Sequence, residues 1–199
     1  MIYLIRHGET DWNSEKRIQG REDIPLNDRG KEQALLLRKV FEGIPLDAAV
    51  SSPLLRAHDT ASVIADAHGL PVITEPDLIE REFGILSAKS YEERDNMEAL
   101  FKDSPLPGME DGRALKKRMM AVIERYCASE FKNIVMVSHG AAIKAALRVM
   151  TDDDLSRKNV WLKNCCINII DKDESSKPVL MRYNLSPEEF SQFMVNPLE

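Results

Sequence analysis

Two short apolar runs constrain the fold of this chain most, because the dipeptide His-Gly follows each of them after one intervening residue. Ile2–Ile5 precedes Arg6-His7-Gly8, and Ile134–Val137 precedes Ser138-His139-Gly140. Short apolar runs rich in β-forming residues predict buried strands. In open α/β sheets, ligands bind beyond the carboxyl ends of the strands. The two histidines are therefore expected at one site.

A third strand end adds to this site. Leu46–Ser51 is a predicted strand, and Ser52-Pro53 is a typical start for a helix that continues to about Ala67 and carries Arg56 in its first turn. Arginine binds phosphate oxygens in a bidentate manner, and a helix N-terminus adds oriented N–H groups. A neutral imidazole among such cations is a competent nucleophile toward phosphorus. The pattern favours a phosphate site.

The remaining elements alternate between strand and helix, which predicts an α/β fold with parallel βαβ units. Residues 7–27 are predicted to form a loop, and 75–110 depart from the alternation, with a short helix capped by Ser90. We interpret residues 1–199 as a single domain with an elaboration at about 75–110. Further helices are expected from Asn27, over 111–128 and over 141–150, with a strand at 72–74 and a terminal hairpin of Cys165–Asp171 and Val179–Tyr183. The hairpin offers an edge strand for a possible homodimer.

Charge and cysteine content exclude several classes. With 27 Lys+Arg against 33 Asp+Glu, the net charge is -6, so no nucleic-acid partner is expected. Three cysteines, two of them adjacent, form neither a disulfide framework nor a zinc pattern. No run is long enough for a membrane span, and the N-terminus lacks a signal peptide pattern. A cytoplasmic protein without membrane association is predicted.

The motif Arg6-His7-Gly8-Glu9-Thr10 strongly resembles the RHG signature of the histidine phosphatase superfamily, also called phosphoglycerate mutase-like. The resemblance extends to about residue 150. It implies a three-layer α/β/α sandwich with a mostly parallel sheet. Matching positions include Asn13, Arg17, Gln19-Gly20, Gly30, Ser51–Leu54, Arg56-Ala57, Glu80, Phe83-Gly84, Pro107-Gly108 and Ser138-His139-Gly140.

The resemblance also implies roles. His7 matches the nucleophile that becomes a phosphohistidine, and Glu80 matches the carboxylate that protonates the leaving oxygen, with Glu82 as its rival. Neither a metal nor a cofactor is implied, and the expected partner is a small phosphorylated substrate. Arg6, Arg56 and His139 match the phosphate pocket, and Asn13, Gln19, Gly20 and Gly140 match substrate-binding positions.

Three functions stay open at this point: a phosphatase, a cofactor-dependent phosphoglycerate mutase, and an inactive phosphate-binding module. The phosphatase is favoured, because Gln19, Phe83 and Ala141 depart from the mutase pattern and the mutase insertion is absent between 85 and 112. Ile85–Ala88 and Met109–Asp111 depart from the phosphatase pattern near the site. Sugar phosphates, phosphoglycerates, nucleotide-like phosphates and α-ribazole phosphate all remain candidate substrates.

Overall fold

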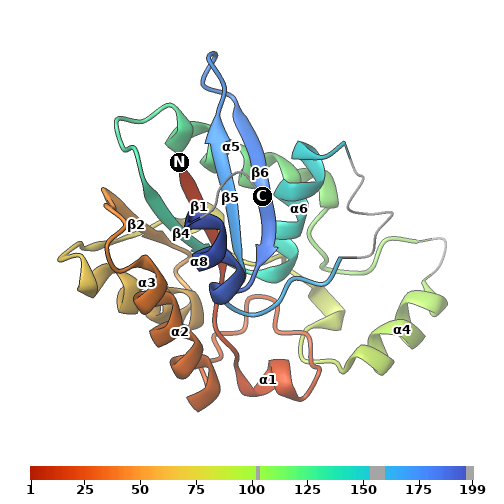
Figure 1. The fold of residues 1–199 in the computed structure, drawn as a ribbon. Coiled ribbons are helices and arrows are strands. Elements are labelled where there is room, and N and C mark those ends of the chain that lie inside the picture. The colour runs from red at the N-terminus through yellow and green to blue at the C-terminus, as the bar shows by residue number, and fades with distance from the viewer. Residues whose placement is uncertain (102–103, 153–159, 196–199) are drawn as a thin grey trace.

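A six-stranded mixed sheet organises the chain, with strand order β3-β2-β4-β1-β5-β6. The computed structural model describes residues 1–101, 104–152 and 160–195 (Figure 1). β3, β2, β4 and β1 are mutually parallel. β5 pairs in antiparallel fashion with β1 on one side and with β6 on the other. The predicted α/β fold with a mostly parallel sheet is therefore confirmed. The strands are β1 (Ile2–Arg6), β2 (Ala48–Ser51), β3 (Val72–Thr74), β4 (Ile134–Ser138), β5 (Ile167–Lys172) and β6 (Pro178–Leu185).

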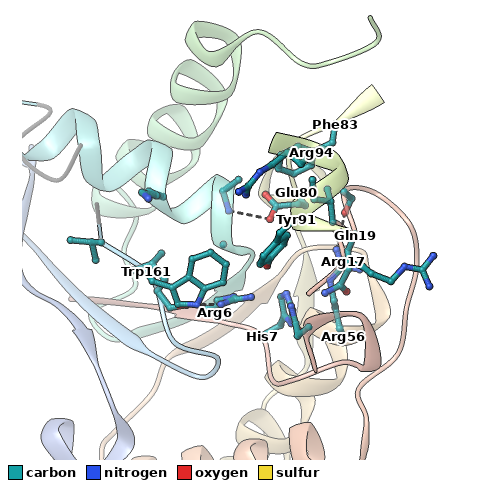
Figure 2. A pocket seen from close by; sticks show the side chains of 18 residues that line it. Arg6, His7, Arg17, Gln19, Arg56, Glu80, Phe83, Tyr91, Arg94 and Trp161 are labelled. Carbon is teal, nitrogen blue, oxygen red and sulfur yellow. Dashed lines mark hydrogen bonds between the residues drawn. The ribbon is translucent and has the colours of Figure 1, made fainter. Parts of the chain in front are cut away.

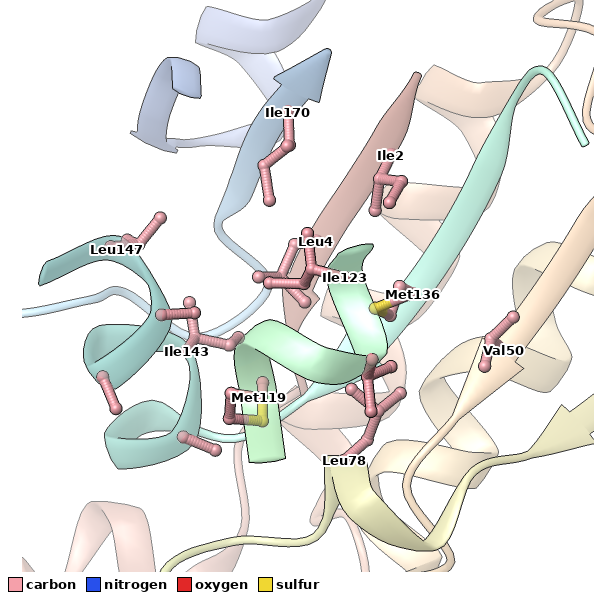
Figure 3. Close-up of a cluster of buried hydrophobic side chains, with 14 of the residues drawn as sticks. Ile2, Leu4, Val50, Leu78, Met119, Ile123, Met136, Ile143, Leu147 and Ile170 are labelled. Carbon is pink, nitrogen blue, oxygen red and sulfur yellow. The ribbon is translucent and has the colours of Figure 1, made fainter. Parts of the chain in front are cut away.

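Helices cover both faces of the sheet, because alternate side chains of each central strand point to opposite sides. Ile2 and Leu4 of β1 belong to a buried cluster with α5 and α6, which Figure 3 shows. Tyr3 and Ile5 belong to a second cluster, with α2, α3 and α8. The result is the three-layer sandwich that the resemblance implied. The helices are α1 (Asp11–Ser14), α2 (Asp28–Phe41), α3 (Leu55–Ala67), α4 (Tyr91–Leu100), α5 (Gly112–Cys127), α6 (Gly140–Met150) and α8 (Pro187–Val195).

Several local predictions hold and others need correction. Asn27 caps α2 by accepting a hydrogen bond from the N–H of Gly30 at 2.8 Å, as its position predicts. The predicted loop over 7–27 instead contains α1, capped by Thr10. The helix predicted from Ser52-Pro53 begins later, with Leu54 as a cap that makes no side-chain hydrogen bond.

The C-terminal part contains the predicted hairpin and one additional helix. β5 and β6 pair in antiparallel fashion, with β6 forming one edge of the sheet. α8 follows and buries Phe190 against Tyr3 and Phe41, at ring-centroid distances of 5.6 and 5.1 Å. The homodimer expected at the edge strand stays a prediction.

The segment over 75–110 contains two short 3-10 helices, η1 (Pro76–Leu78) and η2 (Gly84–Leu86), followed by α4. Leu78 and Leu86 are fully buried, so the segment is anchored to the rest of the protein at these points. Between the two 3-10 helices the chain carries Glu80 to the same edge of the sheet as the two His-Gly strand ends.

Candidate active site

A cavity of about 200 Å³ lies at the carboxyl ends of the parallel strands (Figure 2). Figure 2 shows His7 and Arg56 close together and Glu80 on another side of the cavity. The ring of His139 lies near that of His7, with ring centroids 5.2 Å apart. The fold thus brings together all nine residues that the sequence singled out. Those that line the cavity are Arg6, His7, Asn13, Gln19, Gly20, Arg56, Glu80 and Gly140.

His7 is buried and has a defined tautomer. Its Nδ1 lies 2.6 Å from the carbonyl oxygen of Gly8. A carbonyl oxygen can only accept, so Nδ1 holds the proton and Nε2 carries the lone pair. Burial lowers the pKa of His7 well below its usual range, and the charges of Arg56 and Arg6 lower it further. The imidazole is therefore neutral and its free nitrogen is nucleophilic.

The backbone around His7 is held on two sides. Its N–H donates to the carbonyl of Ser138 at 3.0 Å, which continues the pairing of β1 with β4. On the other side, the side-chain amide of Asn164 donates to the carbonyl of His7 at 3.1 Å. The N–H of Cys165 donates to the carbonyl of Arg6 at 3.0 Å. These hydrogen bonds fix the backbone from which the imidazole ring of His7 extends, before any ligand binds.

His139 is also neutral. Its Nε2 lies 2.7 Å from the hydroxyl of Ser52, while its Nδ1 has no hydrogen-bond partner among the described residues. Burial lowers the pKa of His139 well below its usual range, with further contributions from Arg56 and His7. The sequence pattern placed Ser52 at a helix start but did not predict this contact.

Two buried guanidinium groups supply the positive charge. Arg56 is only 1% exposed, and it donates to the carbonyls of Glu22 and Gly20 at 2.6 and 2.9 Å. Arg6 donates to the carbonyl of Leu162 at 2.5 Å. Burial lowers the pKa of Arg56 to about 10, so the group stays charged near neutral pH.

Neither arginine forms an ion pair with a carboxylate of the described chain, and the Nε atoms of Arg6 and Arg56 have no hydrogen-bond partner there. Burying a charge without a partner is costly, and buried polar atoms without partners call for an explanation. An anion that accepts from both guanidinium groups would satisfy them. The arrangement is suited to a phosphoryl group.

Glu80 reaches the cavity from the segment before η2. Its carboxylate oxygens accept hydrogen bonds from the N–H groups of Ala141 and Ala142 at 3.1 and 2.9 Å, at the N-terminus of α6. Glu80 is buried, with 8% of the residue exposed, and it lines the cavity. Glu82 does not line it, and its side chain is 36% exposed. The geometry therefore favours Glu80 over its rival.

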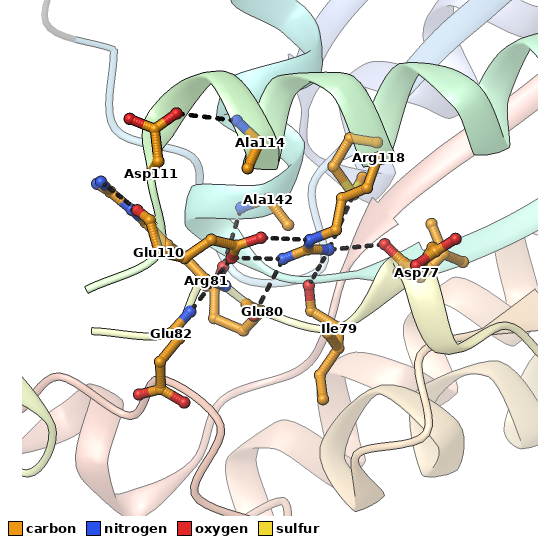
Figure 4. A network of polar contacts seen from close by, with 12 residues as sticks. Asp77, Ile79, Glu80, Arg81, Glu82, Glu110, Asp111, Ala114, Arg118 and Ala142 are labelled. Atoms are coloured by element: carbon orange, nitrogen blue, oxygen red, sulfur yellow. Dashed lines mark hydrogen bonds and ion pairs between the residues drawn. The ribbon is translucent and has the colours of Figure 1, made fainter. Parts of the chain in front are cut away.

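Arg118 of α5 holds the segment that carries Glu80, as Figure 4 shows. Its guanidinium donates to the carbonyls of Asp77, Ile79 and Glu80 at 2.6, 2.7 and 3.2 Å. It also donates to the carboxylate of Glu110 at 2.8 and 3.0 Å. Burial raises the pKa of Glu110, but the hydrogen bond and charge of Arg118 lower it by more. The divergent Met109–Asp111 segment thus supplies an ion-pair partner.

The glycines that follow the two histidines have different surroundings. Gly8 does not line the cavity, and a Cβ there would lie 2.6 Å from the carbonyl oxygen of Gly30. Gly8 therefore packs against the start of α2. Gly140 does line the cavity, and a Cβ there would lie 3.4 Å from Nε of Arg6.

The outer part of the cavity was not predicted from sequence. The edge-to-face pair of Tyr91 and Trp161, with centroids 5.6 Å apart, lines it, and Trp161 is 61% exposed. Trp161 therefore forms part of the cavity wall. Arg17, Phe83, Arg94 and Lys144 also line the cavity.

Neither a metal cluster nor a membrane helix stands out in the part of the chain that the structure describes. No group of three or more His, Cys, Asp or Glu side chains there is arranged to hold a metal ion. None of the helices in that part has both the length and the apolar character needed to cross a bilayer.

Comparison with known proteins places this geometry in a family. A family model of the histidine phosphatase superfamily (branch 1) matches residues 2–186. "Uncharacterized phosphatase PhoE" of Bacillus subtilis is 34% identical over 186 residues, covering 93% of this chain and 94% of its own. "Probable phosphoglycerate mutase GpmB" of Proteus mirabilis is 33% identical over 184 residues, covering 87% and 86%.

Solved structures of similar proteins have the same fold. A phosphoserine phosphatase from Entamoeba histolytica, in complex with 3-phosphoglyceric acid, superposes with a TM-score of 0.79 at 29% identity, covering 92% of this chain and 96% of that one. YhfR of Bacillus stearothermophilus gives a TM-score of 0.81 at 25% identity, covering 90% and 94%. The chain belongs to the histidine phosphatase superfamily. Within that superfamily, similar proteins are named as phosphatases and as phosphoglycerate mutases.

Proposed function

We propose that the chain hydrolyses small phosphomonoesters through a phosphohistidine formed on His7. The observation that carries this proposal is the pair of buried guanidinium groups, Arg6 and Arg56, which flank a neutral His7 without any carboxylate partner in the described chain. Such a site attracts the phosphoryl group and stabilises the charge that develops during its transfer.

The reaction proceeds in two steps. First, Nε2 of His7 attacks phosphorus, the bond from phosphorus to the ester oxygen breaks, and protonated Glu80 gives its proton to the leaving oxygen. Next, water attacks the phosphohistidine, its proton passes to Glu80, and the nitrogen–phosphorus bond breaks to release inorganic phosphate. A single carboxyl group serves first as acid and then as base. His139 and the arginines hold the equatorial oxygens.

A small leaving group is consistent with a cavity of about 200 Å³. Substrates named for similar proteins, such as phosphoserine, are candidates that fit this size. A cytoplasmic location is part of the proposal, supported by three cysteines that are all free and buried. We also propose that hydrolysis requires no added metal ion.

The first test measures hydrolysis of 4-nitrophenyl phosphate by the full chain and by His7→Gln. We expect at least about a thousandfold loss of kcat in the variant, since the nucleophile is removed. Protein labelled from the substrate and quenched in alkaline detergent should carry base-stable, acid-labile phosphate in the wild type alone. Full activity of a folded His7→Gln would refute the mechanism.

The relatives named as phosphoglycerate mutases make a mutase the second candidate. The assay measures conversion of 3-phosphoglycerate to 2-phosphoglycerate with 2,3-bisphosphoglycerate present, alongside phosphate release. Phosphate release that exceeds isomerisation supports the phosphatase, and the reverse supports the mutase. Phosphate binding without any turnover would instead indicate an inactive binding module.

A further inference from the structure

Lys144 lines the cavity beyond the phosphoryl pocket, as do Arg17 and Arg94. α6 begins at Gly140, which lies next to Arg6, and Lys144 follows one turn later on the same face. Four residues of helix advance about 6 Å along the axis. The side chain of Lys144 lines the same cavity as His7. The cavity therefore carries positive charge outside the phosphoryl pocket as well as inside it.

Lys144 differs from the other outer cations in lacking a counterion. Arg17 lies 3.2 Å from the carboxylate of Glu15, and Arg94 lies 2.6 Å from that of Asp95. Among the residues that the structure describes, no carboxylate pairs with Lys144. Its charge is thus available to a ligand.

The surroundings of Lys144 make its charge effective. Its side chain is partly buried, and burial together with Arg148 lowers its pKa, two effects that a bound anion would oppose. The aromatic rings of Tyr91 and Trp161 line the same cavity. Charges attract more strongly beside such apolar groups than in open water.

We propose that Lys144 forms a subsite for a second anionic group of the substrate. The preferred substrates are then small phosphomonoesters that carry a carboxylate or a second phosphate a few bonds away from the reacting phosphoryl group. This inference rests on the proposed function, since it assigns the reacting phosphoryl group to the pocket of Arg6 and Arg56. A short spacing follows from the rise of about 6 Å between Gly140 and Lys144 and from the small cavity.

The test measures binding, so it does not depend on turnover. Isothermal titration calorimetry compares alkylphosphonates with two to four methylene groups against the matching ω-carboxylates and ω-bisphosphonates. We expect at least one anion-bearing compound to bind about tenfold or more tightly than its uncharged counterpart, because a charge-assisted contact contributes that much. The better of the two series identifies carboxylate or phosphate as the second group.

Substitutions at Lys144 assign this advantage to its side chain. In Lys144→Met the advantage should fall below about threefold, and Lys144→Arg should retain most of it, because the charge is kept. Lys39→Met, in the last turn of α2, is the matched control and should behave as wild type. The proposal is refuted if no chain length shows an advantage, or if the advantage persists in Lys144→Met.

Failure of this inference is distinct from failure of the proposed function. Hydrolysis of 4-nitrophenyl phosphate that depends on His7, without any preference for a second anion, overturns the subsite alone. Absence of His7-dependent hydrolysis overturns the phosphatase mechanism alone. A preference for ω-anionic phosphonates that is lost in Lys144→Met would still support the anion subsite at Lys144.

Discussion

The two buried histidines should make the protein less stable as pH falls below 7. The folded-state pKa values of His7 and His139 lie well below 6.5, mainly because burial disfavours the charged imidazolium and the arginines oppose it. In the unfolded chain both histidines titrate near 6.5. Between the folded and unfolded pKa values the unfolded state therefore binds more protons, so the free energy of unfolding rises with pH there.

The magnitude follows from linkage. Each histidine contributes a slope of up to about 1.36 kcal/mol per pH unit once the unfolded form is protonated. Integration from pH 7 to 5.5, with an unfolded pKa near 6.5, gives about 1.25 kcal/mol for each residue and up to about 2.5 kcal/mol for both. The stability is fully present above the unfolded pKa and is lost as pH falls toward the folded pKa. Carboxylates with lowered pKa values act at lower pH.

Urea unfolding followed by tryptophan fluorescence measures this loss at four pH values between 5.5 and 7. Phosphate buffers must be avoided, because an anion bound to Arg6 and Arg56 would stabilise the folded state by mass action. His7→Gln should remove about half of the pH dependence, and His7→Gln/His139→Gln should remove nearly all of it. A double variant with the full wild-type slope would refute the reasoning, as would a wild type that gains stability on acidification.

Further changes test the site. Arg118→Leu should cost about 2–3 kcal/mol of stability, because the charge-assisted hydrogen bonds of a partly buried ion pair with Glu110 are lost, and urea unfolding measures it. In folded Arg118→Lys, displacement of Glu80 should lower kcat/KM more for alkyl phosphates than for nitrophenyl phosphates. An equal fall for both esters would mean that Arg118 has only a structural role. Glu80→Gln should lower kcat/KM about a hundredfold for an alkyl phosphate but under tenfold for 4-nitrophenyl phosphate, and equal losses would exclude Glu80 as the acid. Excess chelator should leave phosphate release unchanged; strong inhibition would contradict metal independence.

Sequence patterns predicted the parts of the site that local order determines. Each His-Gly pair directly follows an apolar run, so the direction of β1 and β4 places both histidines at one edge. Asn27 shows the same locality, because a cap bonds within its own first turn. Such features depend on few neighbours in the chain, and the pattern contains those neighbours.

Contacts between segments that are distant in the sequence could not be predicted from such local patterns. Ser52 is a good helix cap by composition, yet the fold places its hydroxyl 2.7 Å from His139, and the helix starts at Leu55 instead. Arg118 looks like one of several basic residues on α5, and only the packing of α5 over η1 shows that it holds the Glu80 segment. The close packing of Gly8 on Gly30 also joins segments that are distant in sequence.

The net charge of -6 and the cationic cavity are parts of one arrangement. Carboxylates pair with many exposed cations, including Arg17 and Arg94 at the cavity mouth, but none pairs with Arg6 or Arg56 in the described chain. Backbone carbonyls hold those two guanidinium groups in place without neutralising them. A carboxylate in place of these backbone carbonyls would form an ion pair with the guanidinium groups. It would stabilise the free protein, but it would compete with phosphate for the same groups. The unpaired guanidinium groups lower the stability of the free protein and form a pocket for an anion. The two histidines are neutral, so they add no positive charge that would repel the arginines.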